Sequence, residues 1–230
     1  MMKNTEIDVI FPEALFDYER FEHRHLFANV RYVWEALLLL RDYIAKCIAR
    51  PRRQMNADIM QGAIVGPDVI LGEGVVIEPN VYIKGPAIVG DRTVVRHCAY
   101  VRENVIIGED CVIGYSTEIK HSIVMNGTRA GHCNYIGDSI IGFNSNLGAG
   151  VKFANRKITD TDVIARNLDG EKFTTGLRKL GAITGDDTQI GCNSVLNPGT
   201  LLGRGCVVYP VLSVQGTHSH HEVIKSMCDV

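Results

Sequence analysis

The segment that decides the fold begins at Val65 and reads VGPDVI LGEGVV IEPNVY IKGPAI VGDRTV VRHCAY VRENVI IGEDCV IGYSTE, up to Ile119. Each six-residue group opens with an aliphatic side chain, and its fifth residue is small or β-branched. This period fits neither an α-helix, with about 3.6 residues per turn, nor a strand that alternates about every two residues. It indicates short strands joined by corners, with three groups forming one triangular coil.

The repeat continues beyond Ile119 with interruptions. It slips by one residue before Val124, takes a second five-residue step from Ile136 to Ile141, is lost over 154–182, and returns from Thr184 onward. Stacked coils of this kind pair as parallel strands about 4.8 Å apart. They bury a continuous core that no single coil could bury. We therefore expect a parallel β-helix over residues 56–215 with an inserted loop at 154–182, followed by a C-terminal tail at 216–230.

The N-terminal region, residues 1–55, follows a different pattern. Residues 28–49 carry apolar side chains at helical spacing, and the pattern ends before Pro51. These residues are Val30, Val33, Trp34, Leu37, Leu40, Ile44, Cys47 and Ile48. We expect an amphipathic helix that caps the open first coil or joins an oligomer interface. A role in binding another partner is the alternative.

The composition limits the kinds of binding partner and the cellular compartment that we expect for this protein. The formal net charge of the 230 residues is −2, which does not indicate a nucleic-acid or anionic-membrane partner. The apolar run 36–40 is too short to cross a bilayer, and the N-terminus lacks the apolar core of a secretory signal. The seven cysteines form no CxxC pair and no zinc-finger spacing. We expect reduced thiols in a cytoplasmic protein without a metal site.

Three cations mark a possible anion site. Lys84, Arg102 and Lys120 each follow an inward aliphatic residue and lie 18 residues apart, so they should form a column on the outer surface. One interpretation is a solvated face on which salt screens the repulsion. The other is a phosphate site, because arginine and lysine are the usual phosphate ligands. Glu118 shares this outward face.

His132 lies twelve residues after Lys120, in the hexad Ala130-Gly131-His132-Cys133-Asn134-Tyr135. An isolated exposed histidine in a corner is usually structural. Beside a phosphate site it becomes a candidate general base, because its ordinary pKa near 6.5 lets it accept a proton at neutral pH. Nothing nearby in the sequence would activate Cys133 as a nucleophile.

The motif Ala130-Gly131-His132-x-x-Tyr135-x-Gly137-Asp138, followed by Asn146-Leu147-Gly148-Ala149-Gly150, resembles a known family. It is similar to the acetyltransferase domain of the bifunctional enzymes that make UDP-N-acetylglucosamine. Arg102, Glu118 and Lys120 fall at the spacing of that family, and residues 175–182 resemble its archaeal branch. The resemblance covers about residues 60–212 and does not include the nucleotidyltransferase domain.

The resemblance implies an all-β, left-handed parallel β-helix of hexapeptide repeats with an N-terminal helical segment, packed as a homotrimer with sites between subunits. It implies transfer of an acetyl group from acetyl-CoA to glucosamine 1-phosphate, with no metal required. The implied catalytic residues are His132 as the base, Glu118 as its support and Asn146 beside the amine. The implied substrate ligands are Arg102, Lys120, Tyr135 and Asn155, with Lys179 in place of a loop lysine. Ala149, through its backbone N–H, and Cys192 would contact the coenzyme.

The sequence departs from the family after Asn155, where it reads Arg156-Lys157-Ile158-Thr159. This departure leaves other acceptors open, namely a different sugar phosphate or a nucleotide sugar. It also leaves open a non-catalytic scaffold or regulatory protein.

Two histidine groups suggest further readings. A zinc-dependent carbonic anhydrase of the β-helix type would use His97, His121 and His132, although Gly137 stands where that family needs another histidine. A metal site in the tail at His218, His220 and His221 is the alternative to a disordered end.

Overall fold

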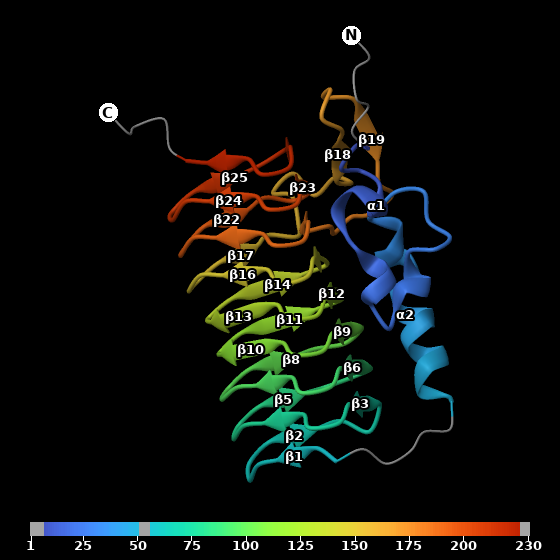
Figure 1. Ribbon diagram of the computed structural model, residues 1–230, viewed down its shortest axis with the longest axis vertical. Helices are drawn as coiled ribbons and strands as arrows, with labels where there is room; N and C mark the ends of the chain where they lie inside the picture. Colours follow the sequence, from blue (N-terminus) through green and yellow to red (C-terminus); the bar gives the residue numbers. More distant parts are fainter. Residues whose placement is uncertain (1–6, 51–55, 226–230) are drawn as a thin grey trace.

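The computed structural model describes residues 7–50 and 56–225. Most of these residues belong to stacked coils, whose short strands form three parallel sheets around one axis (Figure 1). The chain passes from the first sheet to the second and then to the third in every coil. The predicted parallel β-helix is confirmed.

The strands of each sheet follow in spatial order. The first sheet contains β1 (Asp58–Ile59), β4 (Val76–Ile77), β7 (Val94–Val95), β10 (Val112–Tyr115), β13 (Arg129–His132), β16 (Asn146–Leu147), β21 (Gln189–Ile190), β24 (Val207–Val208) and β27 (Val223–Ile224). The second contains β2 (Ile64–Val65), β5 (Tyr82–Ile83), β8 (Tyr100–Val101), β11 (Glu118–Lys120), β14 (Tyr135–Gly137), β17 (Lys152–Phe153), β22 (Val195–Leu196) and β25 (Ser213–Val214). The third contains β3 (Val69–Leu71), β6 (Ala87–Val89), β9 (Val105–Ile107), β12 (Ser122–Val124), β15 (Ile140–Ile141), β20 (Ala182–Thr184), β23 (Thr200–Leu202) and β26 (Thr217–His218).

The register between strands explains the irregular repeat. Val94 pairs with Val112, one regular coil later, and Val112 pairs with Arg129, one residue short of a regular coil. The two slips in the sequence are therefore shortened coils that stay in register. Ile140 pairs with Ile183 because the intervening residues leave the prism as an inserted loop. This loop carries an antiparallel hairpin of β18 (Ile164–Arg166) and β19 (Lys172–Thr174).

The aliphatic positions of the repeat point inward, as predicted. The buried core includes Ile77, Ile83, Val89, Val95, Val101, Ile107, Ile113, Ile119, Val124, Ala130, Ile136, Ile141, Leu147 and Phe153. The stack continues past residue 215, because β26 pairs with β23 and β27 pairs with β24. The expectation of a tail from residue 216 is therefore wrong as far as Ile224. The last coil is shorter than the others, since Leu201 pairs with Thr217, and the six-residue period is lost there while the stacking persists.

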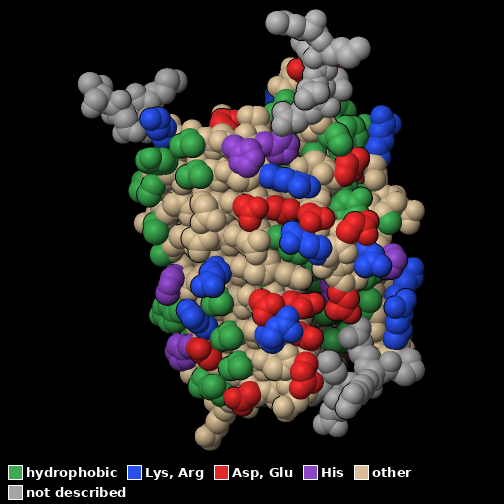
Figure 2. Space-filling view, in the orientation of Figure 1, with side chains coloured by type: hydrophobic (Ala, Val, Ile, Leu, Met, Phe, Trp, Pro, Cys, Tyr) green, Lys and Arg blue, Asp and Glu red, His purple; other side chains and the backbone are tan. Residues whose placement is uncertain are grey.

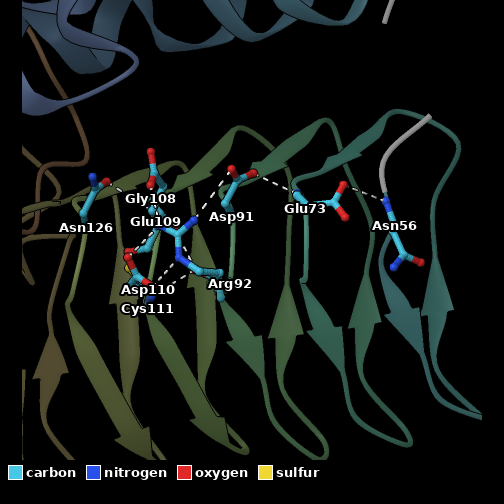
Figure 3. Close-up of polar contacts among 10 residues, drawn as sticks. Asn56, Glu73, Asp91, Arg92, Gly108, Glu109, Asp110, Cys111 and Asn126 are labelled. Carbon is cyan, nitrogen blue, oxygen red and sulfur yellow. Dashed lines mark hydrogen bonds and ion pairs between the residues drawn. The ribbon is translucent and has the colours of Figure 1, made fainter. Parts of the chain in front are cut away.

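The corners between the third and first sheets are held by side chains from the following coil (Figure 3). Asp91 Oδ1 accepts a hydrogen bond of 2.8 Å from the backbone N–H of Glu73. Arg92 donates to Glu109 Oε2 at 2.7 Å and to Asp110 Oδ1 at 2.8 Å. The hydrogen bond and charge of Arg92 hold the pKa of Asp110 below its ordinary value. These bonds use corner groups that the strands leave unpaired, so this edge is structural.

The N-terminal segment covers the outer face of the third sheet (Figure 1). It contains α1 (Pro12–Leu15), two 3₁₀ turns (Tyr18–Arg20 and Arg24–Leu26) and α2 (Glu35–Ile48). Its buried side chains share a second apolar core with the outward residues of the third sheet, namely Ile88, Ile106, Ile123, Ile140, Ile183 and Leu201. The amphipathic helix is confirmed, but it begins at Glu35 rather than near residue 28, and its expected place over the open first coil is wrong. The helix lies along the third sheet because the outer face of that sheet is apolar, and removing apolar surface from water stabilises the fold.

The cysteines divide by burial into two groups. Cys47, Cys111 and Cys206 are buried, whereas Cys98, Cys133 and Cys192 are exposed. Burial raises the pKa of Cys111 to about 12 and that of Cys206 to about 11.

We expect brief alkylation of the folded protein near neutral pH to modify Cys98, Cys133 and Cys192 but not Cys111 or Cys206, because the thiolate is the reactive form. Peptide mass spectrometry reads each site separately, and denatured protein is the control in which all should react. Rapid labelling of Cys111 in the folded protein would contradict this arrangement. Cys228 lies outside the described residues.

Candidate active site

His132 lies at the edge where strands of the first sheet pass into the second, which we call the His132 edge. It ends β13, and the chain turns through Cys133 and Asn134 into β14. The buried Asn134 donates to the carbonyl of Gly148 at 2.8 Å and accepts from the backbone N–H of His132 at 3.2 Å. These bonds hold the corner in place while the His132 side chain stays exposed.

Ala149 and Cys192 follow His132 along this edge on successive coils. The backbone N–H of Gly150 donates to the His132 carbonyl at 3.0 Å, and that of Asn193 donates to the Ala149 carbonyl at 2.8 Å. Within residues 7–50 and 56–225, the backbone N–H of Ala149 donates to no acceptor. A donor beside an exposed imidazole is what an oxyanion formed next to a general base would need.

A depression of about 210 Å³ lies beside His132 on the outer face of the first sheet. Its lining includes His132, Asn146, Arg96 and Arg129. The sequence motifs did not mark the two arginines. The Arg96 and Arg129 side chains form no hydrogen bond or ion pair within the part of the chain that the structure describes. Each is a single outward cation in the sequence, and only the stacking of coils brings both beside His132.

The cationic column lies at a different edge, between the second and third sheets. Its members are paired with carboxylates: Lys84 Nζ lies 3.3 Å from Glu103 Oε2, and Arg102 Nη1 lies 3.0 Å from Glu118 Oε1. A second contact of 3.6 Å joins Arg102 to Glu103. The expected repulsion between stacked cations is therefore largely neutralised. The Nε atom of Arg102 is nevertheless buried without a hydrogen-bond partner among the described residues.

The same edge brings Lys120, Tyr135 and Asn155 together around Asp138. Lys120 Nζ lies 2.9 Å from Asp138 Oδ2, and the Asn155 side-chain amide donates to the same oxygen. A Cβ atom on Gly137 would come within 2.8 Å of the Tyr135 hydroxyl and 2.6 Å of Asn155 Nδ2. A larger residue at position 137 would therefore displace the ends of these two side chains. Burial, followed by the charges of Glu118 and Asp138, raises the pKa of Tyr135.

The predicted site residues thus form two groups within one chain. His132, Asn146, Ala149 and Cys192 belong to the first sheet and the His132 edge, whereas Arg102, Lys120 and Asn155 lie at the edge between the second and third sheets. Glu118 contacts Arg102 rather than His132. Lys179 is exposed in the inserted loop. The catalytic and binding roles of all these residues stay predictions.

The surface carries mixed charge. On the face shown in Figure 2, lysine and arginine side chains lie among aspartate and glutamate side chains rather than in a continuous basic stripe. No helix within the described ranges is long and apolar enough to cross a membrane.

The histidines of the zinc hypothesis do not converge within the chain. His97 and His132 lie at the His132 edge, but His121 follows β11 at the edge between the second and third sheets. Burial lowers the pKa of His121. Residues 7–50 and 56–225 contain no group of three or more His, Cys, Asp or Glu side chains placed to hold a metal ion. In the last coil, His218 Nδ1 lies 2.8 Å from Glu222 Oε1.

Two family models match the chain: the GMPPB C-terminal domain at residues 84–168 and the hexapeptide repeat of succinyl-transferase at residues 181–209. The bifunctional protein GlmU of Methanococcus maripaludis strain C7 is 40% identical over 180 residues, which cover 78% of this chain and 42% of that protein. Most of this chain is similar to part of the GlmU proteins. The predicted resemblance, including its archaeal character, is thereby confirmed.

Two further curated proteins are similar to this chain. The GlmU of Methanococcus maripaludis strain S2 is 35% identical over the same share of each chain. The bifunctional sugar-1-phosphate nucleotidylyltransferase/acetyltransferase of Sulfurisphaera tokodaii is 34% identical over 108 residues, or 47% of this chain and 27% of that protein. The chain therefore spans less than half the length of these curated relatives. A solved UDP-N-acetylglucosamine acyltransferase from Campylobacter jejuni is 18% identical, with a TM-score of 0.41 over 70% of this chain and 68% of that one.

Proposed function

We propose that the chain is an acetyltransferase that moves an acetyl group from acetyl-CoA to the amine of an amino-sugar phosphate, with glucosamine 1-phosphate as the first candidate. The observation that carries this proposal is the His132 edge, where an exposed imidazole and the unpaired N–H of Ala149 lie on neighbouring coils. The similarity to GlmU and to a nucleotidylyltransferase/acetyltransferase supports the reaction class. The same similarity supports a place in UDP-N-acetylglucosamine formation.

The proposed mechanism is direct attack without an acyl-enzyme. The substrate amine forms a C–N bond to the thioester carbon while His132 accepts a proton from the amine nitrogen. The Ala149 N–H donates to the oxyanion of the tetrahedral intermediate. The C–S bond then breaks, and the coenzyme leaves as a thiol after His132 returns the proton. Asn146, in the same depression, holds the acceptor beside the amine, and Cys192 lies next to the coenzyme.

In this proposal, the edge between the second and third sheets supplies the binding site for the acceptor. Tyr135, Lys120 and the unpaired Nε of Arg102 hold the sugar phosphate, and Asn155 contacts the sugar. The two edges of one chain lie on either side of the second sheet, so a complete site needs two copies. The described part of the N-terminal segment, residues 7–50, packs on the third sheet. The first and second sheets are the surfaces that we assign to contacts in a homotrimer. Lys179 and Glu118 would take their roles, as loop ligand and as support of His132, in that assembly.

Release of free thiol from acetyl-CoA tests this function. We expect turnover with glucosamine 1-phosphate and slower or no turnover with glucosamine 6-phosphate, nucleotide-linked amino sugars and hydroxy-sugar phosphates. A faster reaction with another acceptor would change the assigned substrate but not the chemistry. Absence of thiol release with every acceptor, for a folded protein at high concentration, would favour the non-catalytic scaffold instead.

A further inference from the structure

The inserted loop lies beside the last coils of the β-helix (Figure 1). Its hairpin of β18 and β19 is fixed to them, because Thr217 Oγ1 donates to the carbonyl of Arg166 at 2.6 Å. Val163 and Ala165 are buried in the same apolar core as α2 and the third sheet. A Cβ atom on Gly199 would come within 2.8 Å of Val163, so the loop packs closely against the corner of the coil. These contacts hold the hairpin against the last coils, where it forms the wall of a cavity.

A cavity of about 520 Å³ lies between this wall and the last two corners that join the second and third sheets. Lys157, Arg166 and Lys172 line it from the loop, and Gly199 and Gly216 line it from the corners. None of its lining residues is acidic. The volume falls within the range of about 300–1,000 Å³ that is common for small-molecule sites.

The three cations of this cavity have no carboxylate partner among the described residues. Lys157 Nζ donates to the Asp162 carbonyl at 2.7 Å and to Thr161 Oγ1 at 3.3 Å, and Arg166 donates to the Gly170 carbonyl at 3.3 Å. Lys172 has no hydrogen bond or ion pair from its side chain there.

Two other cations of the same loop are neutralised. Arg156 and Arg178 both pair with Asp160 at 2.9 Å. The acidic side chain of Asp160 therefore neutralises these two arginines, and the three cavity cations keep their charge for an anionic ligand.

Arg166 and Lys172 also lie directly opposite one another in the antiparallel register of the hairpin. Like charges directly opposite one another destabilise a strand pair. The cost is offset when an anion binds between them. Backbone donors add to the site, since the N–H groups of Gln215 and Gly216 have no acceptor within the described ranges. Gly216, at φ +85°, has no side chain to keep a ligand away.

We propose that this cavity binds the phosphate groups of a nucleotide. Two sources share that chemistry. One is the 3′-phosphorylated ADP end of acetyl-CoA, and this source rests on the proposed acetyl transfer. The other is a free nucleotide or nucleotide sugar that binds independently of the donor.

Isothermal titration calorimetry on the full chain tests the proposal without requiring turnover. The probes are adenosine 3′,5′-bisphosphate and UDP-N-acetylglucosamine, each with and without saturating acetyl-CoA. The double variant Arg166→Gln/Lys172→Gln should bind the effective probe at least tenfold more weakly than wild type, because two charge-assisted contacts are lost. Lys46→Gln, an exposed lysine on α2, is the matched control and should bind as wild type does.

Thermal unfolding of the same variants separates binding from folding. The double variant should unfold at the same temperature as wild type or higher, because the opposed charges are removed. Competition with acetyl-CoA identifies the donor tail as ligand, and binding that persists beside acetyl-CoA identifies a separate nucleotide. Either result supports the site. No binding of either probe, or equal affinity in wild type and double variant, overturns it.

Discussion

His132→Ala is expected to lower kcat for acetyl transfer by about 10²–10⁴-fold, the usual contribution of a general base. KM for the acceptor should change little, because the phosphate ligands of the proposed site lie at the other edge. Steady-state thiol release at saturating acetyl-CoA measures both constants. The backbone bond from Gly150 to the His132 carbonyl does not depend on the imidazole, so the edge should keep its shape.

His97→Ala is the matched control. His97 lies on the same edge, and its ring stacks on Tyr115 with centroids 6.1 Å apart. Its removal should leave kcat within about twofold of wild type if His132 alone accepts the proton. Full activity in His132→Ala would exclude this histidine as the base. An equal loss in both variants would instead indicate damage to the edge.

Trp34→Ala should destabilise the protein by about 3–5 kcal/mol, the range for removing a fully buried aromatic side chain. Trp34 is 1% exposed. Its ring stacks on Tyr32 at 4.9 Å and lies 6.4 Å from Phe173 of the hairpin. The cavity would loosen the contact between the N-terminal segment and the inserted loop. Because Trp34 is the single tryptophan of the chain, circular dichroism rather than tryptophan fluorescence should follow denaturant unfolding.

Leu38→Ala provides the comparison on the same helix. Leu38 is 55% exposed, so its truncation should change the free energy of unfolding by no more than about 0.5 kcal/mol. A loss below about 1 kcal/mol for Trp34→Ala would contradict the docking of α2 on the third sheet. The same small loss in both variants would show that the segment contributes little to global stability.

The sequence contains a pattern that predicts a cover on the third sheet, in addition to the six-residue period of inward residues. Ile88, Ile106, Ile123 and Ile140 each precede an inward residue and lie one coil apart. Two aliphatic residues in succession place one on each face of a strand. The third sheet is therefore apolar on both faces and needs a cover. Which surface of which helix provides the cover depends on packing between residues far apart in the chain.

Part of the candidate site could likewise be predicted from the sequence, and part depends on the tertiary structure. His132 and Ala149 lie one coil apart, at an interval of 17 residues that the repeat predicts. Cys192 reaches the same edge only after 43 residues, because the inserted loop intervenes. The partners of the charged side chains do not recur in this way. Glu103 contacts both Lys84 and Arg102, and the meeting of Arg96 with Arg129 beside His132 depends on the coil that is one residue short.

The sequence alone determined the coil and the residues that fill it. These follow from a local backbone pattern repeated at a fixed period, so each hexad carries the same information. The tertiary structure alone decided how the cations are paired, which sheet α2 covers, and where the inserted loop forms its cavity. These depend on long-range packing and side-chain conformation, which no period in the sequence encodes.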